Sequence, residues 1–175
     1  MLQPPRPLVE TELIHVTAES DVTALLERLL SCDVIAVDLE HHSFRSYLGL
    51  TCLMQISTRD CDFIVDTLAL RTHLQPLNRV FTDPNIVKVM LIDSNRDTLA
   101  QVAMLSLSVL QVFHGAMEDV RWMQRDLSLY LVNLFDTHEA SYPLEFERHS
   151  LAHLLQHYCG VTTNKKFQLA DWRIR

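Results

Sequence analysis

A short apolar run that leads directly into two acidic residues constrains this chain more than any other feature of its sequence. Residues 34–37 are four consecutive apolar residues, which is typical of a central strand covered on both faces. Asp38 and Glu40 follow at once, and side chains at positions i and i+2 of a strand share one face. The sequence therefore predicts two carboxylates side by side where a buried strand ends, the edge of an α/β sheet at which ligands bind.

The chemistry of this carboxylate pair points to a metal ion. Adjacent carboxylates repel, so one of them loses its charge unless a cation lies between them. Oxygen ligands suit a hard divalent cation such as Mg²⁺ or Mn²⁺. Asp119 adds a third acid in the first turns of a helix predicted over residues 116–126, where the helix dipole favours a carboxylate. An Asp-x-Glu pair by itself fits a solvated strand end equally well.

The remaining pattern predicts an α/β domain in which strands come first and later alternate with helices. Glu118 and Asp126 are expected on a solvated helix face. The expected elements are a Pro-rich extended lead-in over 1–18, a helix capped by Ser20 or Asp21 with four leucines on one face, strands over 50–57, 61–66 and 129–135, and helices over 68–80, 116–126 and 151–159.

Composition excludes several classes of protein. Only 3 glycines are present, so neither a GxGxxG nor a GxxxxGK[ST] phosphate loop can be written. The formal charge of −7 excludes a basic nucleic-acid tail, although carboxylate metal sites are themselves locally acidic. The 4 cysteines form no CxxC pair and indicate buried thiols in a reducing compartment. No apolar stretch reaches the roughly 20 residues of a membrane span, so we expect a soluble intracellular protein without membrane association.

Longer motifs connect these residues to a known family. Residues 34–57 carry Asp-Leu-Glu-His at the strand end, and 113–126 read Phe-His-Gly-Ala-x-x-Asp-x-x-Trp-x-Gln-x-Asp. Both segments, with shorter matches at 134–138, 149–151 and 165–175, resemble the motifs of RNase D-type 3′–5′ exonucleases. Within that family, the sequence looks like the branch of exoribonucleases associated with the nuclear RNA exosome.

The resemblance implies a ribonuclease H-like fold with a mixed central sheet flanked by helices. It also implies two divalent metal ions, Mg²⁺ or Mn²⁺, with Asp38 bridging both, Glu40 binding one ion and the 3′-terminal hydroxyl, and Asp119 holding the other. The implied substrate is a single-stranded RNA 3′ end, which is hydrolysed to nucleoside monophosphates. The implied partner is the nuclear exosome core, in RNA and rRNA processing and decay. The implied location is the nucleus, including the nucleolus.

Three further positions match family residues that contact the terminal nucleotide: His41, Trp122 and Lys165. Their chemistry is suitable, because an indole offers a stacking plane, an ammonium a phosphate partner and an imidazole a hydrogen bond near the sugar. Alternatively, Trp122 belongs to the core, Lys165 is a solvated surface residue and His41 is a bystander. We expect Asp136 to form a turn and His114 to brace its loop. The other histidines of the motifs are expected to have structural roles; they are His42, His138 and His149.

The first departure from the family pattern concerns its third motif, Tyr-x-x-x-Asp. No tyrosine of this sequence has an aspartate four residues later, and Asp171 belongs to a different motif. We therefore expect the fold to be incomplete at its C-terminus, without the general-base tyrosine and the fourth acid. The alternative function is a catalytically impaired fragment that acts at most as an RNA- or exosome-binding module.

The second departure is an insert. The family reads Val-Lys-Val-Phe-His-Gly without a break, whereas residues 89–111 separate Val87-Lys88 from Val112-Phe113 here. A valine codon begins with GT and a glutamine codon can be CAG, which are the two ends of a typical intron. Our hypothesis is that residues 89–111 are a translated intron within a partial exonuclease domain over 19–175. The alternative is a genuine loop of this lineage.

Overall fold

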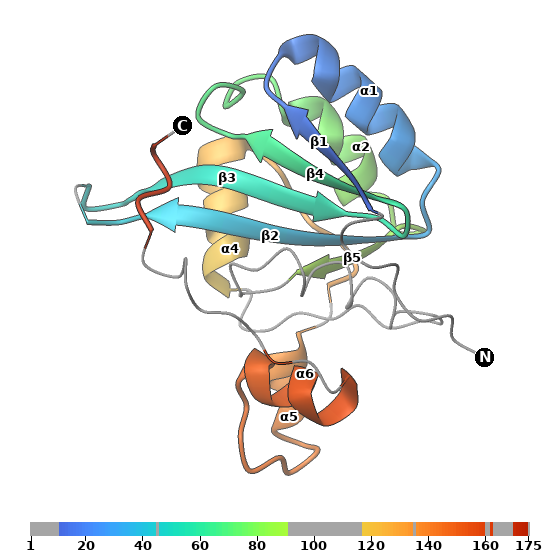
Figure 1. The fold of residues 1–175 in the computed structure, drawn as a ribbon, viewed down its shortest axis with the longest axis vertical. Coiled ribbons are helices and arrows are strands. Elements are labelled where there is room, and N and C mark those ends of the chain that lie inside the picture. Colours follow the sequence, from blue (N-terminus) through green and yellow to red (C-terminus); the bar gives the residue numbers. More distant parts are fainter. Residues whose placement is uncertain are drawn as a thin grey trace.

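The described part of the chain is built on a mixed five-stranded sheet. The computed structural model describes residues 11–44, 46–90, 117–134, 136–159, 162 and 170–174. The strand order is β1-β4-β3-β2-β5; β1 pairs in parallel with β4, β2 in parallel with β5, and the central pairs are antiparallel (Figure 1). This arrangement confirms the expected mixed α/β architecture. The strands are β1 (Glu12–Val16), β2 (Val34–His42), β3 (Leu50–Ser57), β4 (Cys61–Asp66) and β5 (Val87–Met90).

The helices lie beside, behind and below the sheet in the view of Figure 1. In the same view α5 and α6 lie below the sheet, while α4 crosses behind its central strands. Among the described helices, none is long and apolar enough to cross a membrane. The helices are α1 (Glu19–Leu30), the 3₁₀ turn η2 (Gln75–Leu77), α2 (Asn78–Phe81), α4 (Met117–Trp122), the π-helical turn η3 (Met123–Leu127), α5 (Thr137–Ser141) and α6 (Leu151–Cys159).

Helix α1 buries one face against the sheet and the α2 region. Leu25, Leu26 and Leu29 are buried in the core, whereas Leu30 is 36% exposed. The helix begins at Glu19 with Ala18 in the cap position, so the expected capping by Ser20 or Asp21 is wrong in detail. The Asp21 carboxylate instead accepts hydrogen bonds from the backbone N–H groups of Thr17 and Ala18, which satisfies donors ahead of the first turn.

The lead-in and the first acidic strand also differ from expectation. The lead-in, expected to be merely extended, contains β1, which pairs with β4 and so belongs to the sheet. Strand β2 continues past the apolar run through Asp38 and Glu40 to His42, because β3 pairs with it over this whole length. The two carboxylates therefore lie inside the sheet and not beyond its end.

One predicted helix forms only in its last part, over residues 75–80, and one predicted strand does not join the sheet. Residues 68–80 begin with turns instead of a helix, because the Asp66 carboxylate accepts the N–H groups of Leu68 and Ala69 and Pro76 has no N–H to donate. Residues 129–134 are not a strand of the sheet. They run alongside α2, where Tyr130 N–H donates to Asn78 Oδ1 and Val132 N–H donates to the Phe81 carbonyl.

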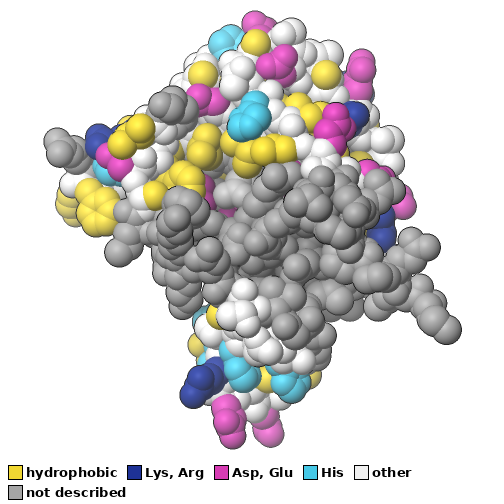
Figure 2. Space-filling view, viewed as in Figure 1, with side chains coloured by type: hydrophobic (Ala, Val, Ile, Leu, Met, Phe, Trp, Pro, Cys, Tyr) yellow, Lys and Arg dark blue, Asp and Glu magenta, His cyan; other side chains and the backbone are white. Residues whose placement is uncertain are grey.

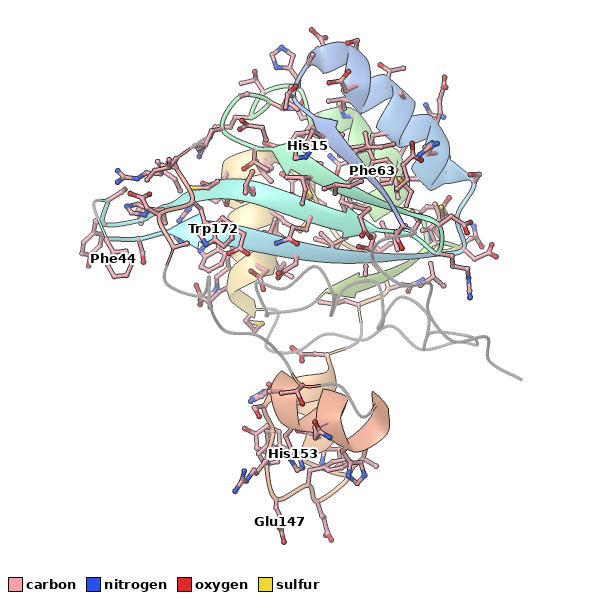
Figure 3. The ribbon with its side chains drawn as sticks, in the orientation of Figure 1. His15, Phe44, Phe63, Glu147, His153 and Trp172 are labelled. Atoms are coloured by element: carbon pink, nitrogen blue, oxygen red, sulfur yellow. The ribbon has the colours of Figure 1, made fainter. Side chains whose placement is uncertain are left out.

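The C-terminal segments were predicted better. Helix α6 has the expected bounds, and the Ser150 hydroxyl accepts the N–H of His153 as an N-cap does. The segment 170–174 returns to the sheet, where Asp171 lies 3.4 Å from His42 Nδ1, and Trp172 is drawn in front of β2 (Figure 3). The expectation of free thiols is confirmed for Cys32, Cys52 and Cys61.

Charge is distributed as the composition suggests. In the space-filling view, acidic side chains are spread around the described surface of the sheet region, and Lys and Arg side chains are few there (Figure 2). Arg28 is one of the paired basic residues, since its guanidinium contacts Glu12 and the thiol of Cys61. The described residues on this face form no broad basic field, so a nucleic-acid contact on this face would depend on individual side chains.

Candidate active site

Strand β2 places two buried carboxylates on one face of the sheet. Asp38 pairs in register with Gln55 of β3, and Glu40 with Leu53. Both acids are buried, and the Gln55 amide donates a 3.1 Å hydrogen bond to Glu40 Oε1. That hydrogen bond holds the Glu40 carboxylate in place beside Asp38.

A bulge follows immediately after the second acid. The register between β2 and β3 shifts between Glu40 and His41: Glu40 pairs with Leu53, but His41 pairs with Thr51. Cys52 is the extra residue of the bulge. Bulges twist a strand and redirect its side chains, and they are over-represented beside active sites. This bulge therefore sets the direction of His41 relative to the carboxylates.

The third candidate acid comes from α4. Asp119 is buried, and its Oδ2 atom has no hydrogen-bond partner among the described residues. Burial raises the pKa of this carboxyl to about 7, with smaller contributions from the charges of Glu118 and Asp136. A buried, unsatisfied carboxylate oxygen is rare in proteins, and a bound cation would satisfy it.

The three acids have the oxygen donors that a divalent cation needs, but their side chains do not come together around one point. Within the described ranges, no three His, Cys, Asp or Glu side chains come close enough together to hold one ion. The structure thus places Asp38 and Glu40 on one strand and Asp119 on the helix without completing a coordination sphere. His114 and Lys165 lie outside the described residues, as does nearly all of 89–111.

Two of the three residues predicted to contact RNA meet directly. The rings of His41 and Trp122 stack with 3.9 Å between centroids and 3° between planes. Burial lowers the pKa of His41, and the positive charge of Arg125 lowers it further. Trp122 is partly buried and packs against the core as well, which agrees with the core interpretation, while its contact with RNA stays a prediction.

Asp126 is the residue whose role the sequence interpretation missed. The expected solvated position is wrong: Asp126 is buried and accepts hydrogen bonds from Thr51 N–H at 3.0 Å and Thr51 Oγ1 at 2.9 Å. Arg71 and Arg125 also donate to it. Burial alone would raise its pKa, but the hydrogen bonds from Arg125 and Thr51 outweigh that cost and lower the pKa to about 2.

A signal for this position was present in the sequence. Asp119, Trp122 and Asp126 are spaced i, i+3 and i+7, which places them on one face of a regular α-helix. An inward-facing Asp119 therefore favoured an inward-facing Asp126, and both carboxylates are buried in the structure.

The other polar residues of the motifs have structural contacts. Glu118 is exposed and pairs with Arg121, as expected of a solvated face. Asp136 caps α5 by accepting the N–H groups of His138 and Glu139, which confirms its role as a turn former. The remaining contacts join α5 to the segment before α6: His149 stacks on Tyr142, His149 Nδ1 lies 2.6 Å from Ser141 Oγ, and His138 packs edge-on against Tyr142.

A buried carboxylate strand faced by an acidic helix on a mixed sheet is an arrangement of nucleases that use metal ions. Comparison with known protein families identifies the class: residues 13–101 and 92–175 match the family of 3′–5′ exonucleases. The chain belongs to this 3′–5′ exonuclease family, as its motifs predicted. The two matched segments overlap within the region expected to be an insert.

Individual members of this family are similar to the chain over nearly its whole length. The chain is 52% identical over 170 residues to the exosome complex component 10 of Rattus norvegicus, covering 97% of this chain and 17% of that protein. It is 49% identical to the exosome complex exonuclease RRP6 of Saccharomyces cerevisiae, covering 93% of this chain and 19% of the relative. The chain thus spans less than a fifth of the length of these relatives.

Solved structures agree on the fold. The catalytic core of RRP6 from Trypanosoma brucei matches with a TM-score of 0.81 and 46% identity, covering 100% of this chain and 43% of that one. Escherichia coli RNase D matches with a TM-score of 0.72 and 22% identity over 92% of this chain and 37% of that one, which supports the fold alone. The expected ribonuclease H-like exonuclease fold is confirmed.

Proposed function

We propose that this chain is the exonuclease domain of an exoribonuclease that removes nucleoside monophosphates from single-stranded RNA 3′ ends. The observation that carries the proposal is the buried set of Asp38 and Glu40 on β2 and Asp119 on α4, in a chain of the 3′–5′ exonuclease family. The unsatisfied oxygen of Asp119 supports a cation at this place.

The exonuclease family generally uses divalent metals, and we propose two such ions here, Mg²⁺ or Mn²⁺. Asp38 would contact both, Glu40 would bind one ion and the 3′-terminal hydroxyl, and Asp119 would hold the other. Two bound ions supply an activated water and stabilisation of the leaving 3′-oxygen. The contribution of the chain itself is to bury the carboxylates and to fix Glu40 through the Gln55 amide.

The terminal nucleotide would be bound beside the acids. The stacked pair of His41 and Trp122 offers an aromatic surface and a ring nitrogen next to Glu40 in sequence. Stacking on aromatic side chains is the usual way in which proteins hold unpaired bases. Lys165 is proposed as the phosphate partner, on motif resemblance alone.

The partner and location are proposals from the relatives. Those relatives are named for the exosome complex, so we propose that the protein acts with the exosome core in nuclear RNA processing, including rRNA processing in the nucleolus. Co-purification of the chain with exosome core subunits would support this assignment, and failure to co-purify would count against it.

A second candidate function is a catalytically impaired RNA- or exosome-binding module. One observation favours it: within the described residues, no three His, Cys, Asp or Glu side chains lie close enough together to hold a metal ion.

The deciding experiment is release of nucleotides from a 3′-labelled single-stranded RNA in Mn²⁺. Asp38→Ala should abolish release, whereas the matched control Asp60→Ala, which removes an exposed acid in the β3–β4 turn, should retain it. Release that survives Asp38→Ala overturns the proposed site. RNA binding without any release by the unmodified chain favours the binding module.

A further inference from the structure

The hairpin between β2 and β3 folds back onto His41. Gly49, near the end of the hairpin, has φ +67°, and a Cβ atom there would collide with the imidazole of His41. The same imidazole also stacks on the ring of Trp122. The position of the ring therefore depends on where the hairpin places Gly49.

The side chains of the hairpin provide little packing to fix that position. Phe44, Tyr47 and Leu48 are all exposed, and Phe44 lies at the outer end of the hairpin in Figure 3. A loop with few buried contacts opens at low free-energy cost. Besides the pairing of Leu50 with His42 and the hydrogen bond from Gly49 N–H to the Ser46 carbonyl, an attachment at Leu48 would help to hold Gly49 against His41.

Arg125 supplies such an attachment. Its Nη1 donates a 2.7 Å hydrogen bond to the carbonyl of Leu48, the residue before Gly49. Its Nε and Nη2 donate to the two carboxylate oxygens of Asp126 at 2.6 and 2.8 Å. A guanidinium can make both sets of bonds because its donors form a rigid planar fork.

Asp126 is a firm anchor even without this arginine. Thr51 donates to it from its backbone and its hydroxyl, and Arg71 donates from its Nη2 at 2.9 Å. Of the two arginines on Asp126, only Arg125 is described with a hydrogen bond to the hairpin. The two residues therefore form a matched pair for an experiment.

We propose that Arg125 is a positioning residue of the nucleotide-binding site. By joining the Leu48 carbonyl to the buried Asp126, it holds Gly49 against His41 and thereby keeps His41 stacked on Trp122. The inference rests on the proposed function in that His41 and Trp122 bind the 3′-terminal nucleotide. Arg125 acts through the hairpin and makes no contact with substrate.

The first test uses Trp122 fluorescence in the full chain, in a Trp172→Phe background that leaves one tryptophan. Arg125→Gln should raise the acrylamide quenching constant of Trp122 about twofold, and His41→Ala should do the same, because in both variants the indole loses the ring that covers it. Arg71→Gln removes the same charge and one bond to Asp126 but keeps the bond to Leu48, so it should leave the quenching constant unchanged.

Circular dichroism melting establishes that each variant is folded. Arg125→Lys serves as the milder variant, because an ammonium cannot span both Leu48 and Asp126; intermediate quenching is expected. Unchanged quenching in both Arg125 variants overturns the proposal. An equal rise in Arg71→Gln also overturns it, since the effect would then come from Asp126 and not from the hairpin.

The second test measures affinity for a single-stranded RNA with a free 3′ hydroxyl, by anisotropy in EDTA so that hydrolysis does not occur. Arg125→Gln should raise Kd at least about fivefold, the effect of losing one stacked base, and Arg71→Gln should not. If His41→Ala itself leaves Kd unchanged, the proposed RNA role of His41 fails. The fluorescence comparison then still decides whether Arg125 positions the stack.

Discussion

At the scale of single residues, the site is made of carboxylates in opposite electrostatic situations. Asp119 is buried and has no donor on Oδ2 among the described residues, whereas Asp126, seven residues later, accepts five hydrogen bonds from side chains and backbone. We propose that Asp119 binds a metal cation, while Asp126 is already paired with Arg71 and Arg125. The two residues are both aspartates, so the difference in their pKa values comes from their surroundings and not from the residue type.

The pKa of Asp119 leads to a prediction about stability and metal binding. Because its pKa of about 7 in the folded chain exceeds the ordinary 3.8, protonation stabilises the fold, and that contribution is lost as the pH rises through 7. Asp119→Asn should therefore raise the free energy of unfolding in EDTA at pH 8, by as much as about 4 kcal/mol. Urea denaturation measures this difference.

Adding Mn²⁺ to the same samples tests the metal assignment. Mn²⁺ should stabilise the unmodified chain and not Asp119→Asn, because a ligand that binds only the folded state shifts its stability. Glu118→Gln, at the exposed neighbouring acid, is the matched control and should respond to Mn²⁺ normally. Equal stabilisation of both Asp119 forms would remove Asp119 from the metal site.

Asp126 leads to the opposite pH dependence. Its pKa of about 2 lies below the ordinary 3.8, so the ionised carboxylate stabilises the fold above about pH 4, and this contribution is lost as the pH falls toward 2. Asp126→Asn should lower the free energy of unfolding by about 2 kcal/mol at pH 7. The difference should shrink between about pH 4 and pH 2 in urea titrations; a difference independent of pH would contradict the assignment.

At the scale of elements, α1 stabilises the sheet through one face only. Leu29 is fully buried and Leu30 is 36% exposed, although the two are adjacent. Leu29→Ala should lower the free energy of unfolding by about 3 kcal/mol, because it leaves a cavity between α1 and the sheet. Leu30→Ala removes the same atoms and should cost less than about 1 kcal/mol. Equal losses in denaturant titrations would show that α1 does not pack as described.

The change from α4 to η3 has a consequence for the site. A π-helical turn widens the helix by one residue per turn, and such turns are frequent at functional sites. Here it ends at Ser128, with φ 53°, and the chain then runs beside α2 instead of joining the sheet. The carboxylate of Asp126 thereby reaches Thr51 at the start of β3.

At the scale of the whole molecule, we propose that residues 89–111 interrupt an otherwise continuous exonuclease domain. Strand β5 pairs Val89 with Ala36 and Met90 with Val37, so the first residues of the insert complete the strand. Without the insert, Val112 and Phe113 would follow Lys88 and repeat the same order of valine and a large apolar residue.

Deleting residues 89–111 tests this proposal. The deleted chain should keep its fold and gain on the order of 1 kcal/mol in free energy of unfolding, because a shorter connection costs less entropy to close. Thermal melting and size-exclusion chromatography measure the effect, and transcript sequencing across codons 85–118 shows whether the segment is spliced. Loss of a cooperative transition would mean that the segment is part of the domain.

The sequence predicted the features that depend on interactions between residues close together in the chain, and it failed where side-chain hydrogen bonds or distant residues decide the structure. Periodicity and motif spacing located the strand with Asp38 and Glu40, the helix with Asp119 and the exonuclease family, because these depend on local patterns and whole motifs. Local patterns failed at residues 68–80 and 129–134. There, side-chain hydrogen bonds and contacts with α2 outweigh the propensity of the segment.

What the sequence determined by itself is thus the acidic strand, the acidic helix and the class of chemistry that such carboxylates support. The tertiary structure alone decided that Asp126 is bonded to Thr51, that His41 stacks on Trp122 and that Arg125 joins the helix to the hairpin. Each of these contacts joins segments that are distant in the sequence, with a separation of 75 residues for Asp126 and Thr51 and of 77 for Arg125 and Leu48. Such contacts depend on how the bulged strand and the helix meet in space, which no local pattern encodes.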